Sequence, residues 1–316
     1  MKSPEQFGPQ SEQYKKQEEI AVASEELFED SEMKDLEKKD VRIEQYEQLI
    51  GIDEATEIRE IVSALYKPMK RMLEPVLEKI NGGEFQLLIG EDASGRIPAL
   101  IVRKFIDRAY KEKHLPKIQT RFIAGTTTSD GGMVTKESME YRLKYNRPES
   151  YAHYMGWDEI PSVIEEKKTK ISAYLDEFMS AQSVSISDAL IVTEYISSGN
   201  GLVPLMETLR EKNIAPTILS VYLGFSWDDE SLESLSKIYG GSIFYGHGSP
   251  APKISRKNTL SGVTKHFSDL HAMPVRSLLP GNERESILAK MTIARDEANK
   301  VAERLIAEML FPEEIK

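Results

Sequence analysis

The sequence predicts an α/β fold, namely a doubly wound, mainly parallel sheet flanked by helices, with a helical N-terminal region and a C-terminal helix. Two observations carry this prediction. Near-continuous runs of β-branched and aliphatic residues, such as Ala189–Glu194, are typical of strands that are buried on both faces. Stretches with helical periodicity separate these runs, and an alternation of strand and helix indicates a parallel sheet with helices on both sides.

Five strands and the helices between them follow from this pattern. The strands are expected at Phe85–Gly90, Ile118–Ala124, Ala189–Glu194, Thr217–Leu223 and Ser242–Tyr245. The helices between them are expected at Ile97–Lys113, Ile164–Met179, Leu202–Lys212 and Glu230–Tyr239. Because such sheets bind ligands beyond the carboxyl ends of their strands, we expect the functional residues in the loops that follow the strands.

Changes of composition divide the chain into four parts. The first is dense in Glu, Lys, Gln and Ser and predicts a charged, disordered or loosely helical tail, with a partner-binding helix around Leu27, Phe28 and Leu36 as the alternative. The second is a helical region that we expect to break near Lys67–Pro68, because proline lacks a backbone donor, and to end at Asn81–Gly83. The parts are 1–40, 41–84, 85–250 with an insertion or flap at 124–187, and 251–316.

Charge and composition argue against several classes of protein. The formal net charge of −11 disfavours a nucleic-acid partner, which needs a cationic surface. No stretch approaches the ~18 unbroken apolar residues of a membrane span, and the first residues lack the apolar core of a secretory signal. The chain has no cysteine, which excludes disulfides, thiol catalysis and thiolate metal sites. We therefore expect a cytoplasmic protein without a membrane partner.

The sharpest candidate site follows the strand Ala189–Glu194. Glu194 stands at the carboxyl end of the strand, and the small-residue turn Ser197–Ser198–Gly199–Asn200–Gly201 leads into the next helix. Glycines allow a tight turn in which successive N–H groups converge, and the start of a helix adds partial positive charge, so this turn suits a phosphate. A plain strand-to-helix turn that needs glycine only for its backbone freedom explains the composition equally well.

A similar loop follows the strand Phe85–Gly90. It begins with two acids and continues as Asp92–Ala93–Ser94–Gly95–Arg96 before a helix that starts near Pro98. The forked guanidinium of Arg96 suits a phosphate or pyrophosphate. A surface ion pair between Arg96 and either Glu91 or Asp92 is the alternative.

Together the two loops resemble the type I phosphoribosyltransferase family. Its fingerprint is an aliphatic strand, two acidic residues and a Thr-Gly-x-Thr-like turn that opens a helix. The corresponding residues here are Leu190–Val192 for the strand, Thr193–Glu194 for the acidic pair, Ser198–Gly201 for the turn, and Ala93–Arg96 for the family's pyrophosphate loop. The resemblance extends from about Phe85 to Tyr245.

The resemblance implies binding of phosphoribosyl pyrophosphate with Mg²⁺ and transfer of phosphoribose to or from a nitrogenous base. It makes Glu194 and Arg96 the catalytic candidates, with Glu194 accepting hydrogen bonds from the ribose hydroxyls and Arg96 holding the leaving pyrophosphate. By the same resemblance, Thr193 and Ser197–Gly201 bind the 5′-phosphate end, and Asp92–Gly95 helps to hold the pyrophosphate. Mg²⁺ is then carried mainly by substrate oxygens and not by the protein.

The last part of the chain adds a basic loop and a long helix. Gly246–Lys265 concentrates basic residues and, by the resemblance, belongs to a hood over the base, while a solvated loop is the alternative. The helix Glu283–Leu310 carries an apolar seam at a spacing of three to four residues. We expect this seam to pack on its own domain, and a homodimer through the helix is the alternative.

Two other functions remain beside an active transferase. Thr193 replaces the first acid of the family's pair and Gly201 replaces its final hydroxyl residue. These departures are compatible with a catalytically degenerate sensor or regulatory module that binds a nucleotide or phosphoribosyl pyrophosphate without turnover. A different nucleotide-handling α/β enzyme would use the same kind of phosphate turn, because a fold does not determine a function.

Overall fold

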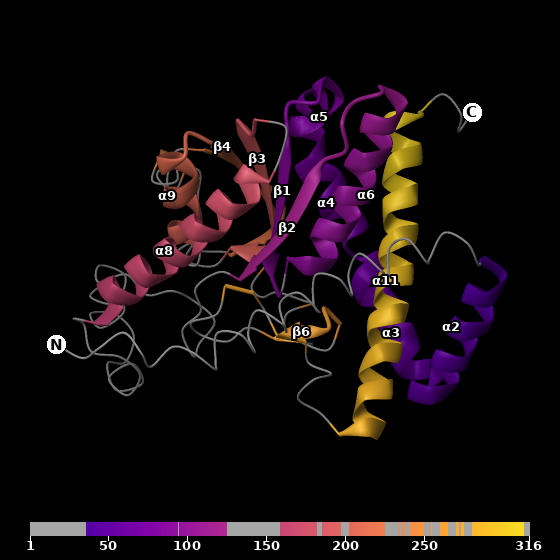
Figure 1. Ribbon diagram of the computed structural model, residues 1–316. Coiled ribbons are helices and arrows are strands. Elements are labelled where there is room, and N and C mark those ends of the chain that lie inside the picture. The colour runs from indigo at the N-terminus through magenta and orange to yellow at the C-terminus, as the bar shows by residue number, and fades with distance from the viewer. Residues whose placement is uncertain are drawn as a thin grey trace.

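A five-stranded parallel sheet lies at the centre of the molecule, with helices on both faces (Figure 1). The computed structural model describes residues 36–93, 95–124, 159–181, 185–196, 202–224, 241–249 and 280–312, with the short pieces 233, 236–237, 254, 260–264, 270–271 and 273–274. The strands are β1 (Leu87–Asp92), β2 (Gln119–Ala124), β3 (Asp188–Ile196), β4 (Ala215–Leu223) and β5 (Ser242–Gly248). Their order is β2-β1-β3-β4-β5, and every neighbouring pair is parallel, which confirms the expected doubly wound α/β sheet.

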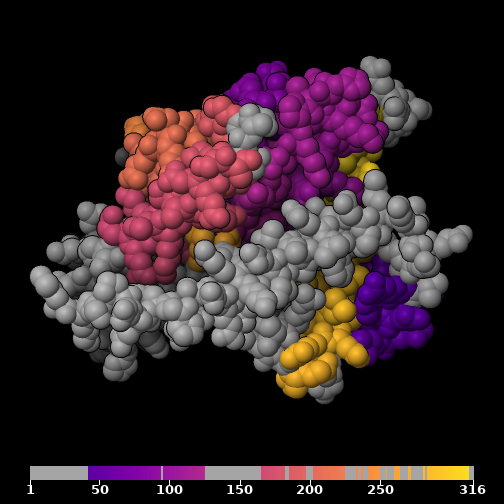
Figure 2. All heavy atoms as spheres, viewed as in Figure 1, coloured from indigo at the N-terminus to yellow at the C-terminus, as the bar shows by residue number. Residues whose placement is uncertain are grey.

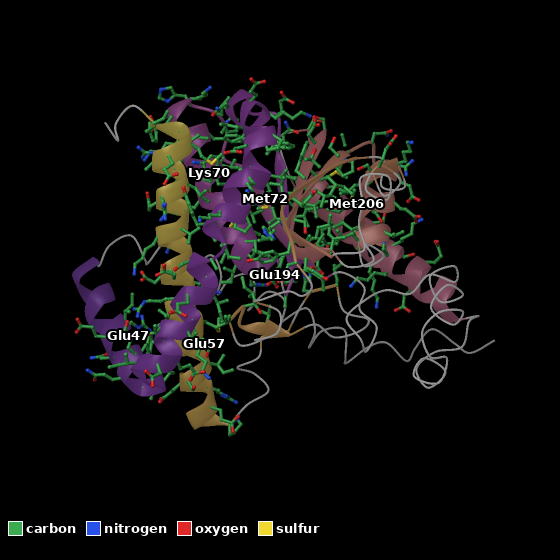
Figure 3. All side chains as sticks on the ribbon, turned by 180° about the vertical axis from the view of Figure 1, so that it is seen from behind. Glu47, Glu57, Lys70, Met72, Glu194 and Met206 are labelled. Atoms are coloured by element: carbon green, nitrogen blue, oxygen red, sulfur yellow. The ribbon has the colours of Figure 1, made fainter. Side chains whose placement is uncertain are left out.

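The sheet separates two hydrophobic cores. On one face lie α4 (Tyr66–Leu73) and α6 (Arg96–Glu112), with α11 (Gly281–Leu310) packed outside α6. On the other face lie α8 (Glu159–Ser180) and α9 (Val203–Glu211). Met72 on α4 and Met206 on α9 mark the opposite sides of the sheet in Figure 3. The space-filling view shows the two helical layers meeting along the sheet, α8 in pink and α6 in magenta (Figure 2).

The N-terminal helices are α2 (Leu36–Ile50), α3 (Ile52–Ser63), α4, a 3₁₀ turn at Glu74–Val76 and α5 (Leu77–Gly82). The break expected near Lys67–Pro68 occurs earlier, at Ala64–Leu65. The reason is that a proline ring clashes with the carbonyl four residues before it, which for Pro68 is that of Ala64. The helical region ends where the sequence predicted, because Gly83 adopts the left-handed conformation (φ 71°) that closes a helix.

The two strands at the centre of the sheet extend past their predicted ends, and β3 continues two residues beyond Glu194 to Ile196. The first strand was expected to end at Gly90, yet Glu91 and Asp92 continue β1 and pair with Ile123 and Ala124 of β2. Composition assigned these acids to the loop, but both are buried, and buried acids are tolerated in a strand where partners satisfy them. The turn after β1 is therefore confined to residues 93–95, and α6 begins at Arg96.

The long helix α11 packs within its own chain. Its apolar seam is buried against α6 and the N-terminal helices, with Ala294, Ala302 and Leu305 fully buried. In Figure 1 its first half extends, together with α2 and α3, beyond the end of the sheet at which the strands terminate. The apolar seam of α11 thus packs on its own domain, as the sequence predicted.

Several sequence predictions lie outside the described residues. The tail is described only from Leu36, where α2 begins. Of the expected insertion or flap, residues 125–158 are outside and α8 is inside. None of the helices in the described part of the chain is long and apolar enough to cross a bilayer.

Candidate functional site

The carboxyl ends of β1 and β3 lie side by side at the centre of the sheet. The strands pair in register from Leu87 with Ala189 to Gly90 with Val192. The chain leaves β1 through α6 on one face and leaves β3 toward α9 on the other. This divergence defines the topological switch point at which doubly wound sheets bind their ligands. Both predicted loops start there.

Arg96 and Asp92 form a buried ion pair across the turn that joins β1 to α6. Nε and Nη2 of Arg96 donate to the two carboxylate oxygens of Asp92 at 2.8 Å and 3.0 Å. The guanidinium also lies over the ring of Phe122 on β2, with 4.4 Å between its central carbon and the ring centroid. Asp92 is fully buried and Arg96 is only 8% exposed, so the ion pair that the sequence suggested is internal and not on the surface.

The turn after β1 folds back onto β3. The N–H of Gly95 donates to the carbonyl oxygen of Glu91 at 2.7 Å. A Cβ on Gly95 would lie 2.5 Å from the carbonyl oxygen of Val192 and 2.7 Å from that of Glu91. Residue 95 must therefore be glycine for the turn to approach β3 this closely. The peptide bond between Asp92 and Ala93 is cis.

Two more carboxylates lie at these strand ends. The Thr193 hydroxyl donates to Glu91 at 3.3 Å, and Glu91 is 7% exposed. Glu194 is fully buried and accepts a hydrogen bond from the backbone N–H of Ile254. It lies at the end of the sheet in Figure 3. The site therefore combines an ion pair with two further acceptor groups.

A tyrosine of the neighbouring strand lies near this carboxylate. Burial, reinforced by the negative charge of Glu194, raises the pKa of Tyr222 on β4 to about 12. The phenol consequently remains protonated at neutral pH. A protonated phenol is a hydrogen-bond donor beside a group that only accepts.

Parts of the segment after β5 lie over the strand ends. Ile254, Leu260 and Ser261 are buried, and Val263 packs against Ala93 of the first turn. The carbonyl of Leu270 accepts a hydrogen bond of 2.8 Å from the N–H of Ala124, the last residue of β2. The short antiparallel pair β6 (Val263–Thr264) and β7 (Met273–Pro274) belongs to this cover, and β6 lies beyond the end of the sheet in Figure 1. Ile254 and residues 260–263 of the expected basic loop are thus buried, whereas Lys253, Arg256, Lys257 and Lys265 lie outside the described residues.

The structure brings part of the predicted site together. Asp92, Ala93, Gly95 and Arg96 lie beside Thr193 and Glu194 at the switch point. Ser94 and the turn Ser197, Ser198, Gly199, Asn200 and Gly201 lie outside the described residues.

Sequence reasoning missed two contributors to the site, Phe122 and Tyr222, and it gave Glu91 only as an alternative surface partner of Arg96. Glu91 directly precedes Asp92, so extending the strand by two residues would have placed it at the same end. Phe122 and Tyr222 lie in strands, where an aromatic residue is ordinarily part of the core, and the sequence carried no signal that distinguished them.

Among the residues that the structure describes, no three His, Asp or Glu side chains form a metal-binding group. Comparisons with models of protein families, with curated proteins and with solved structures find no match.

Proposed function

We propose that the chain binds phosphoribosyl pyrophosphate with Mg²⁺ at the switch point and transfers phosphoribose to or from a nitrogenous base. One observation carries the proposal. The neighbouring strands β1 and β3 end in buried carboxylates, and each leads into a loop rich in small residues. Two phosphate-binding turns on either side of acceptor side chains match a sugar that carries phosphate groups at both ends.

In this proposal the chain mainly positions and stabilises the substrate. Glu194 accepts hydrogen bonds from the ribose hydroxyls and stabilises the positive charge that develops on the ring. The bond from C1 of the ribose to the pyrophosphate breaks, and the pyrophosphate leaves with the electron pair. A nitrogen of the base forms the new bond to C1 and loses its proton. Arg96 and the turn at 93–95 hold the departing pyrophosphate.

The Mg²⁺ ion of this proposal is held mainly by oxygens of the substrate. The donors near the switch point fit such an ion, because the carboxylates of Glu91 and Glu194 offer the hard oxygen atoms that Mg²⁺ prefers. When bound, the ion neutralises charge on the pyrophosphate. The two carboxylates also make the strand ends negative, which favours a ligand that brings its own cation.

A second candidate function is a sensor that binds the same ligand without turnover. Two contacts favour it. The side edge of the Arg96 guanidinium is engaged by Asp92, and Glu194 holds the N–H of Ile254. Both side chains that transfer would use are therefore occupied within the chain.

Pyrophosphate release separates the two candidates. The protein is incubated with phosphoribosyl pyrophosphate, Mg²⁺ and a panel of bases, and its thermal stability is measured with and without the ligand. Release of pyrophosphate supports the transferase, and stabilisation without release supports the sensor. Glu194→Gln should reduce both signals, whereas Glu78→Gln, an exposed control on α5 at the opposite end of β1, should not. Absence of both signals in the unaltered protein would reject both functions.

A further inference from the structure

We infer that Phe122 is a positioning residue that orients Arg96 toward the pyrophosphate end of the ligand. The inference rests on the proposed function and assigns a role to a side chain of the neighbouring strand. Phe122 lies on β2 opposite Gly90 of β1. Its ring lies under the Arg96 guanidinium, 4.4 Å from the central carbon.

The ring is seated where residue 90 has no side chain. A Cβ on Gly90 would lie 2.6 Å from two atoms of the Phe122 ring and 2.9 Å from the Cβ of Ala99. The ring therefore rests on the bare backbone of β1. This close packing fixes the plane of the ring, and the guanidinium that stacks on it adopts a corresponding plane.

Asp92 fixes the remaining rotation of Arg96. Its carboxylate engages Nε and Nη2, which form the side edge of the guanidinium, at 2.8 Å and 3.0 Å. With one face on Phe122 and the side edge on Asp92, the guanidinium is held in one orientation. An arginine that is already ordered loses less rotamer freedom when it binds an anion. The contacts with Phe122 and Asp92 therefore orient the Arg96 guanidinium.

Phe122→Leu tests the role of the ring without changing any charge. Asp92→Asn is less informative, because it loses orientation but also removes a negative charge that opposes anion binding. Phe122→Tyr keeps an aromatic face and should restore the function of the ring. Phe178→Leu is a matched control, since it removes a stack of the same kind, that of Arg121 on Phe178 at 4.2 Å, in the other core.

Two probes separate the two ends of the ligand. Affinity for inorganic pyrophosphate and for ribose 5-phosphate is measured by calorimetry in the presence of Mg²⁺. Loss of the stack should weaken pyrophosphate binding about three- to thirtyfold in Phe122→Leu. Affinity for ribose 5-phosphate should stay at the unaltered value, because the proposed function places that end of the ligand away from Arg96. Phe122→Tyr and Phe178→Leu should bind both probes normally.

Other results would overturn the inference in distinguishable ways. Equal loss of both affinities in Phe122→Leu would indicate a general structural role of the ring. Unchanged pyrophosphate affinity, or an unaltered protein that binds ribose 5-phosphate but not pyrophosphate, would remove the orienting role and leave a phosphate site at the switch point. If the unaltered protein bound neither probe nor phosphoribosyl pyrophosphate, the proposed function would fail and the inference with it.

Discussion

Gly95→Ala is the change to which the switch point should be most sensitive. The added methyl group would lie 2.5 Å from the carbonyl oxygen of Val192, 2.7 Å from that of Glu91 and 3.0 Å from the Cα of Thr193. All three atoms belong to the backbone of strands at the centre of the sheet, so none can move aside as a flexible side chain would. The turn at 93–95 must shift away from β3 instead.

The cost of this shift follows from overpacking. Forcing one extra methyl group into a closely packed site typically destabilises a protein by about 1–3 kcal/mol. We expect Gly95→Ala to fall in the upper half of that range, because the hydrogen bond from Gly95 to Glu91 at 2.7 Å would lengthen as the turn moves. The Arg96 side chain begins at the next residue, so ligand binding should weaken as well.

Urea unfolding followed by circular dichroism measures the effect on stability. Gly281→Ala at the start of α11 is the matched control, because a Cβ there meets nothing within 4 Å. We expect that control to change the free energy of unfolding by less than about 1 kcal/mol. A Gly95→Ala protein as stable as the control would show that the turn does not pack on β3 as described.

Three further changes test other parts of the structure. Asp92→Asn removes the carboxylate that pairs with the buried Arg96 and should reduce the free energy of unfolding, measured in urea, by about 3–5 kcal/mol. If the double variant Asp92→Leu, Arg96→Met loses less stability than Asp92→Asn, the charge of Arg96 is the cause. Leu305→Ala leaves a cavity at a fully buried position of α11 and should lower the free energy of unfolding by about 2–5 kcal/mol. This loss should not depend on protein concentration if the seam packs within one chain. Hydrogen bonds from Tyr66, Lys70 and Arg304 lower the pKa of Glu308 from 4.5 to about 2, so its contribution to stability is present above pH 4.5 and is lost as the pH falls toward 2. Glu308→Gln should remove this acid dependence from urea titrations, and an unchanged pH profile would contradict the cluster.

The fold was predictable because its signal is repeated along the chain. Each central strand is a run such as Ala189–Val192 that is buried on both faces, and such runs have few alternatives to a parallel sheet. The ends of elements were less predictable. Glu91 and Asp92 look like loop residues, but partners such as Thr193 and Arg96, one of them distant in sequence, make their burial in a strand acceptable.

The candidate site was predictable only in part for the same reason. The position of Glu194 at a strand end follows from the local pattern. The contact with Ile254 does not, because it joins residues 60 positions apart. Nor does the stack of Arg96 on Phe122, which depends on the register between β1 and β2. Turn residues and buried strands can be predicted from the local sequence. Contacts between residues of different strands cannot, because they depend on how the sheet is assembled.

The charges at the switch point favour one kind of phosphorylated ligand over another. Arg96 neutralises Asp92, and the carboxylates of Glu91 and Glu194 are buried at the same strand ends. A phosphate placed at those carboxylates would be repelled, whereas hydroxyl groups can donate to them. Under the proposed function, the phosphates would bind at the turns and a hydroxylated ring would lie between them. Phosphoribosyl pyrophosphate has this arrangement, while a nucleoside diphosphate carries its phosphates on one side of the ring and leaves one of the two turns without a ligand. Binding of the first should accordingly exceed binding of the second, and the reverse order would contradict the division of the site into two phosphate turns around a ribose.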